Sequence, residues 1–249
     1  MQFMFTAAGI LRTLLIFSII GIFITIPVLN GNLNIYVGST IFFTALVSDW
    51  LTIPAAARWY ASRGIGNWAL ILYSWYILFY PGFSGKRKII SDMSWIFTDK
   101  NRLQSASMLL SALPENVLTT EPECVFAYSR LLLIQSGNTD KLLDFVESAL
   151  SQNSSERGWY IRGIVLLKNK QYKEALKSFE NARIKSMNSN NIILLGQCYL
   201  FLGIVWKALG HIDYSKDHLL KAEVLLDELP PDLDAALARE LPPNFVRSE

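Results

Sequence analysis

Cysteine and histidine are scarce in this sequence of 249 residues, which contains two of each. Two cysteines exclude a disulfide-dense secreted scaffold. Cys124 and Cys198 stand in apolar contexts without a partner at metal-ligand spacing, so we expect buried thiols, no metal site and no cofactor. The 23 basic residues nearly balance the 21 acidic ones, and this balance gives no argument for binding nucleic acid.

Charge is almost absent from the first 85 residues, which hold only Arg12, Asp49, Arg58 and Arg63. The rest of the chain carries the other 40 of the 44 charged residues. This division predicts a transmembrane anchor over residues 1–85, joined to a domain of ordinary composition.

Three apolar stretches are long enough to cross a bilayer as helices, at about 20 residues per crossing: 7–29, 35–57 and 65–83. A buried core helical hairpin in a soluble protein is the alternative for these stretches, and a cleaved signal peptide is a further alternative for the first. Asp49 is the one acidic residue inside a stretch. It marks either an intramembrane functional group or a helix that slides until the carboxylate reaches the headgroups.

Basic residues set the expected orientation. With all three stretches crossing, three basic residues lie on the first side of the membrane and five lie on the second. The positive-inside rule then places the C-terminal domain in the cytoplasm and predicts an integral membrane protein. Lys86, Arg87 and Lys88 would act as the topology signal and contact membrane lipid.

One short motif indicates an enzyme at first sight. Gly82-Phe83-Ser84-Gly85 is similar to the serine motif of rhomboid intramembrane proteases. Nucleophilic catalysis needs a base near the hydroxyl, and the histidines, His211 and His218, stand far along the chain. We therefore predict no enzymatic activity and no catalytic residue.

The remaining 164 residues have helical periodicity throughout. Apolar residues recur at three- and four-residue spacing, polar or glycine-containing turns separate the segments, and no alternating strand pattern occurs. Helices joined by short turns predict repeated helical hairpins, an all-α solenoid following the three transmembrane helices.

Residues 156–189 contain the side chains that define one hairpin repeat: Trp159, Gly163, Tyr172, Ala175, Phe179 and Ala182. The spacings Trp-x3-Gly and Ala-x3-Phe are those of the tetratricopeptide repeat, and this part of the chain resembles that family. Gly163 and Ala175 are small where two helices approach closely, and the aromatic residues fill the space between hairpins.

Two neighbouring segments resemble the repeat less well. Residues 196–229 keep Gly203 and Ala222, whereas 123–156 has Arg130 where the small residue belongs. We therefore expect three degenerate repeats over 123–229: 123–156, 156–189 and 196–229. Residues 86–122 would form a juxtamembrane linker with docking helices, and 230–249 a C-terminal cap and tail.

The resemblance implies that the first helices of the hairpins line a groove that holds another protein. The groove candidates are Arg157, Tyr160, Ile164, Lys168, Leu200, Ile204 and Lys207. Their charges are all positive, which favours an acidic ligand, although solvated cations on a helix face are the plainer interpretation.

Two functional hypotheses follow from these features. The first is a membrane-bound TPR-like scaffold or assembly factor for protein–protein interaction. The second is an integral subunit of a membrane transporter or enzyme complex, with the repeats as a docking arm.

Overall fold

The structure is a computed structural model that describes residues 53–79, 83–136, 139, 141–233, 237 and 241. Every regular element in these residues is a helix. The chain divides into two units, one made of residues 1–61 and 65–89 and the other of residues 62–64 and 90–249.

The described part of the first unit is a helical hairpin followed by the start of a further helix. Residues 53–62 are helical, α3 runs over Gly66–Phe79, and α4 begins at Phe83 and continues to Asp99 in the second unit. The turn between the first two helices uses Gly64 at a φ of +79°, a conformation that favours glycine. α3 buries Ala69 and Tyr73 and leaves Trp68 and Trp75 exposed.

The length of α3 corrects the membrane prediction. Its 14 residues span about 21 Å, which is short of a hydrocarbon core of about 30 Å. Across the described part of the chain, no helix combines the length and the apolar character of a bilayer crossing. This finding overturns the predicted fold class with three transmembrane helices and the predicted location as an integral membrane protein.

The prediction of membrane spans was based on hydropathy, which counts apolar residues but does not show where a helix begins and ends. Of the three proposed spans, 65–83 contains α3, which stops at Phe79. The span 7–29 and Asp49 lie outside the described residues, and so does 35–57 apart from 53–57.

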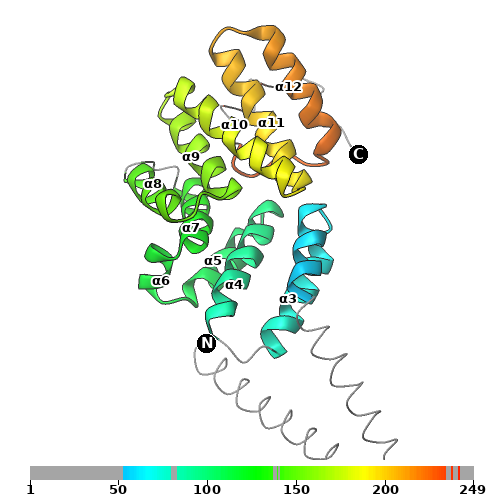
Figure 1. Cartoon of the computed structure of the whole chain (residues 1–249), viewed down its shortest axis with the longest axis vertical. Helices are drawn as coiled ribbons and strands as arrows, with labels where there is room; N and C mark the ends of the chain where they lie inside the picture. Colours follow the sequence, from blue (N-terminus) through cyan, green and yellow to red (C-terminus); the bar gives the residue numbers. More distant parts are fainter. Residues whose placement is uncertain are drawn as a thin grey trace, which may run out of the picture. The chain divides into compact units, whose positions relative to one another are not determined.

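The second unit is a series of antiparallel helices (Figure 1). Three hairpins follow one another, and each helix packs on the next. This packing confirms the expected TPR-like helical repeats. After α4, the helices are α5 (Leu103–Ser111), α6 (Glu115–Thr120), α7 (Pro122–Gln135), α8 (Leu142–Gln152), α9 (Glu156–Lys168), α10 (Tyr172–Asn188), α11 (Ile192–Ala208) and α12 (Ile212–Leu225).

The turns after α9, α10 and α11 share one helix-ending motif. After α9, the N–H of Lys170 donates to the carbonyl of Leu167 and the N–H of Gln171 to the carbonyl of Leu166, both at 2.9 Å. These paired bonds satisfy carbonyls that the end of a helix leaves free, and they require a left-handed residue after the helix. Lys170, Asn190 and Gly210 occupy that position after α9, α10 and α11, with φ values of +59°, +55° and +85°.

Two side chains cap the first turns of the helices α9 and α11. The hydroxyl of Ser155 accepts a hydrogen bond from the N–H of Gly158 at 3.2 Å and caps α9. The side-chain oxygen of Asn191 accepts from the N–H of Leu194 at 3.3 Å and caps α11. Such caps satisfy one of the four N–H groups that the first turn of a helix leaves without a partner.

Close approach within the hairpins depends on glycine. A Cβ added at Gly163 of α9 would lie 2.6 Å from the ring of Phe179 on α10, and one at Gly203 of α11 would lie 2.6 Å from Leu219 on α12. The other residues expected to build the repeat fall into two groups. Ala175, Ala182 and Ala222 are fully buried, whereas Trp159 and Tyr172 are half-buried.

Lys170→Gly tests the cost of the left-handed turn residue. A non-glycine residue pays about 1–2 kcal/mol in this conformation, while glycine pays about 0.5–1 kcal/mol in lost chain freedom. We expect the variant to raise the free energy of unfolding by up to about 1 kcal/mol in chemical denaturation. The matched control, Lys177→Gly inside α10, should lower it by about 1 kcal/mol, and a loss in both variants would contradict the assignment.

Candidate partner-binding groove

The groove expected from the sequence would lie on the face formed by the first helices of the three hairpins, α7, α9 and α11. We call this the first-helix face. Two other parts of the same unit contact it: the second half of α4, from Ile90 to Asp99, and the 226–233 segment that follows α12. The first-helix face is therefore already occupied by the chain itself, as the contacts below show.

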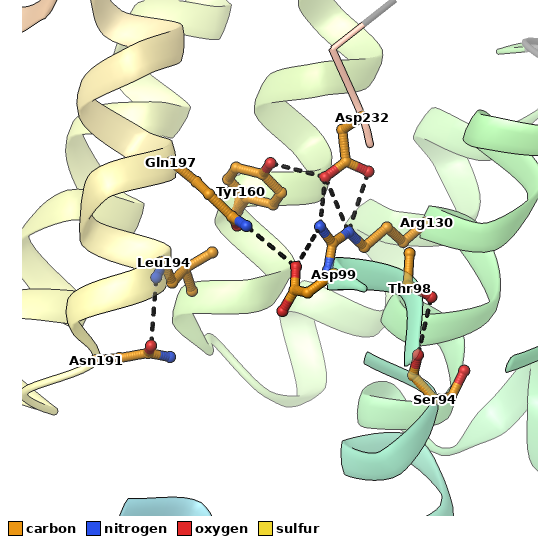
Figure 2. Close-up of polar contacts among 9 residues, drawn as sticks. All are labelled: Ser94, Thr98, Asp99, Arg130, Tyr160, Asn191, Leu194, Gln197 and Asp232. Carbon is orange, nitrogen blue, oxygen red and sulfur yellow. Dashed lines mark hydrogen bonds and ion pairs between the residues drawn. The ribbon is translucent and has the colours of Figure 1, made fainter. Parts of the chain in front are cut away.

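Arg130 of α7 is the centre of this contact, and its side chain is fully buried (Figure 2). Its Nε lies 3.0 Å and 2.9 Å from the two carboxylate oxygens of Asp232, and its Nη2 lies 2.6 Å from Oδ2. The same Nη2 lies 2.8 Å from Oδ1 of Asp99, at the end of α4. A buried guanidinium is tolerated only when it is paired in this way.

Two further side chains hold these carboxylates in place (Figure 2). The hydroxyl of Tyr160 on α9 donates to Oδ2 of Asp232 at 2.8 Å. The amide Nε2 of Gln197 on α11 donates to Oδ1 of Asp99 at 3.1 Å. The Arg130 cluster, which consists of these five residues, thus joins all three first helices to α4 and to the 226–233 segment.

The electrostatics of the cluster follow from burial and pairing. Burial alone would lower the pKa of Arg130, but Asp232 and Asp99 together raise it above its ordinary value. Burial raises the pKa of Tyr160, and the neighbouring carboxylate of Asp232 raises it further. Arg130 therefore stays charged and Tyr160 stays a proton donor, which is the combination that the observed hydrogen bonds require.

A second cation on the same face pairs with α4. Nη1 of Arg157 on α9 forms an ion pair with Asp92 at 2.5 Å, and it lies 3.7 Å from the carboxylate of Glu123 on α7. The ring of Trp95 lies close to both arginines, 4.3 Å from Cζ of Arg130 and 5.0 Å from Cζ of Arg157. Arginine over an indole ring is attracted by the negative face of the ring.

The spacing of the α4 residues explains how one helix makes these contacts. Asp92, Trp95 and Asp99 are three and four residues apart, so they project from one side of the helix. Both Asp92 and Trp95 are almost fully buried. α4 therefore presents an acidic and aromatic stripe to the arginines of the first-helix face.

Aromatic packing continues from this stripe into the hairpins. The ring of Tyr160 lies 6.2 Å from Trp95, 6.1 Å from Phe179 and 5.7 Å from Phe201. Phe179 and Phe201 stack at 5.3 Å. Edge-to-face and stacked pairs at these distances add to the stabilisation from buried apolar area.

The predicted groove residues divide into a closed centre and a partly open edge. Tyr160, Ile164, Leu200 and Ile204 are buried, and the Arg157 side chain is 16% exposed. Lys168 and Lys207 are half-buried in the last turns of α9 and α11. Lys168 Nζ lies 3.5 Å from the carbonyl oxygen of Leu133 on α7.

The other expected functional residues lie on α4, α7 and α11. Lys86, Arg87 and Lys88 lie on the first half of α4, and their predicted role as a topology signal depended on membrane spans that the described chain does not show. Cys124 of α7 and Cys198 of α11 are buried, and neither forms a disulfide. The described residues contain no group of three or more metal-ligating side chains.

Comparisons with known proteins give one distant likeness. No protein-family model matches the sequence, and no curated protein matches it. Among solved structures, the chain is similar to the crystal structure of the MamA protein, with 15% sequence identity and a TM-score of 0.39. The match covers 70% of this chain and 89% of that one. A likeness this distant does not establish membership of a family.

Sequence reasoning named Tyr160 as a groove candidate, but it did not connect Arg130 or the two aspartates of the cluster to a site. Arg130 stands where the repeat pattern requires a small residue, and such a departure indicates a special contact. The 92–99 stripe was also visible as three residues on one helical face. Asp232 had no local signal, because its partner is 102 residues away in the chain.

Arg130→Met tests how much the cluster stabilises the second unit. The substitution leaves Asp232 buried without its cation, and breaking a buried pair in this way costs about 3–5 kcal/mol. We expect a drop of that size in the free energy of unfolding, measured by denaturant titration.

The control for this variant is Lys221→Met, which breaks the exposed pair between Lys221 and Asp217 at 2.6 Å. Surface pairs contribute little because water screens them, so this variant should unfold almost as the wild type does. Equal behaviour of the two variants would contradict a stabilising role of the Arg130 cluster.

Thiol chemistry offers an independent check on the core. Burial raises the pKa of Cys198, so its reactive thiolate is scarce at pH 8. In a Cys124→Ser background, we expect negligible reaction with Ellman's reagent in the folded protein and one equivalent of thiol after addition of guanidinium chloride. Fast reaction in the folded state would show that α11 is not packed as described.

Proposed function

We propose that this protein is a scaffold for protein–protein interaction, built on TPR-like helical hairpins. One observation carries the proposal: the first-helix face already holds two separate peptide elements, α4 and the 226–233 segment. It holds them with arginine, tyrosine and glutamine side chains that contact carboxylates. A surface of this composition is suited to holding acidic segments of a protein.

The partner would contact the edge of the first-helix face where Lys168 and Lys207 lie. Each lysine is in the last turn of its helix, and each remains partly accessible while the centre of the face is filled. Positive charges at the rim of an interface steer acidic partners and raise the association rate. We therefore propose an acidic surface on the partner, and assembly of a complex as the cellular role.

A subunit of a membrane transporter or enzyme complex is not carried forward. That hypothesis depended on Asp49, which lies outside the described residues, and on membrane spans that are not observed among the described helices. The TPR-like hairpins support a docking surface without it.

Site-specific photocrosslinking in the source cells tests the proposal. A photoreactive side chain is placed at Lys168 or at Lys207, and in control chains at Lys173 of α10 or Asp217 of α12, which are exposed on second helices. We expect the two edge positions to capture the same protein and the control positions to capture it much less.

Charge reversal provides the second arm of this experiment. With the probe at Lys207, Lys168→Glu should lower the yield of the same adduct severalfold, and added salt should do likewise. Equal capture at all four positions, or no adduct at the two edge positions, would refute the proposed surface.

A further inference from the structure

The 226–233 segment occupies the first-helix face in the manner of a bound peptide. It is not helical, and it follows directly after α12. Three of its residues are buried: Leu226, Pro230 and Asp232. Between them, Asp227, Glu228 and Leu229 are exposed. Buried anchor residues separated by exposed residues are typical of a peptide seated in a groove.

The segment is anchored by side chains. Leu226 packs where Gly196 of α11 leaves room, since a Cβ at Gly196 would lie 2.8 Å from Leu226. Asp232 contacts Arg130 and Tyr160. Within the described residues, the backbone hydrogen bonds of the segment are local, from Leu226 N–H to the carbonyl of Ala222 and from Leu233 N–H to the carbonyl of Pro230. These two backbone hydrogen bonds could therefore remain when the segment leaves the first-helix face.

The receptor side of the contact would survive the departure of Asp232. Arg130 would keep the carboxylate of Asp99 at 2.8 Å and the ring of Trp95 at 4.3 Å, so no unpaired cation would be stranded. Exchange of Asp232 for the carboxylate of another peptide would also leave the charge of the cluster unchanged.

The resident segment leaves hydrogen-bonding capacity unused. Nη1 of Arg130 is buried and has no hydrogen-bond partner among the described residues, and the same holds for Oε1 of Gln197. A buried donor without an acceptor lowers the stability of the occupied state. A peptide that brought one more acceptor to Nη1 would bind this site better than the 226–233 segment does.

We infer that the Arg130 cluster is a receptor for an acidic peptide segment, and that the 226–233 segment is its resident, exchangeable occupant. The inference rests on the proposed scaffold function and names the partner chemistry: an extended segment with an aspartate flanked by apolar residues. Such a partner segment competes with the protein's own segment. Binding of the partner and release of residues 226–233 therefore occur together.

Because the resident segment is part of the same chain, its effective concentration decides how well a free peptide can compete with it. An occupant on the same chain has an effective concentration in the millimolar range, so a free peptide competes poorly with it. Weakening the tethered occupant should therefore reveal the receptor to a peptide added in solution.

A labelled peptide of residues 226–233 is the probe, and its binding to the purified full chain is measured by fluorescence anisotropy. We expect weak binding to the wild type and at least ~10-fold tighter binding to Asp232→Asn, whose own segment has lost its charged anchor. The same peptide with asparagine in place of its aspartate should not bind Asp232→Asn. The matched control, Asp217→Asn on α12, should bind the probe no better than the wild type.

A second variant opens the site without altering any charged group. Leu226→Ala removes the apolar anchor of the resident segment and leaves the receptor unchanged, and it should also strengthen binding of the probe, which keeps its leucine. Arg130→Met introduced into this chain should abolish the gain. Circular dichroism establishes that each chain is folded.

Equal binding of the aspartate and asparagine peptides to Asp232→Asn and to Leu226→Ala would overturn the inference. Probe binding is measured on purified protein, whereas the proposed scaffold function is tested by crosslinking at Lys168 and Lys207. The two can therefore fail separately.

Discussion

A single buried cation constrains the arrangement of the second unit. The Arg130 side chain has no exposure to water, so its charge must be balanced by groups of the protein. Asp99 supplies one carboxylate from α4 and Asp232 supplies another from beyond α12. Because Tyr160 and Gln197 bind these same carboxylates, the requirement for charge balance connects α4, α7, α9, α11 and the 226–233 segment.

The contacts of Arg130 determine which part of the TPR-like hairpins is open to a partner. An open row of first helices would offer a free groove, but here α4 and the 226–233 segment cover its centre. In the proposed function, recognition takes place at the edge of the face near Lys168 and Lys207, or it requires exchange of an occupant at Arg130. Both proposed routes favour acidic partners, since these three side chains are cationic.

Sequence patterns succeeded where the contact is local and failed where it is not. The small residue at Gly163 was expected from the repeat pattern, and the structure places the ring of Phe179 against it. The apolar stretch 65–83 was interpreted as a membrane span because its composition is apolar, yet α3 ends after 14 residues. Composition reports how apolar a stretch is, whereas the length of a helix depends on where its backbone hydrogen bonds stop.

The sequence by itself determined the helices, their turns and the hairpin repeat, because periodicity and turn residues act over a few positions of the chain. It also marked Arg130 as a departure from the repeat pattern. Only the tertiary structure decided what Arg130 pairs with, since Asp232 is 102 residues away and no local pattern records such a partner. Burial made a carboxylate partner for Arg130 necessary, and the pairing closed the centre of the first-helix face that the repeats alone would have left open.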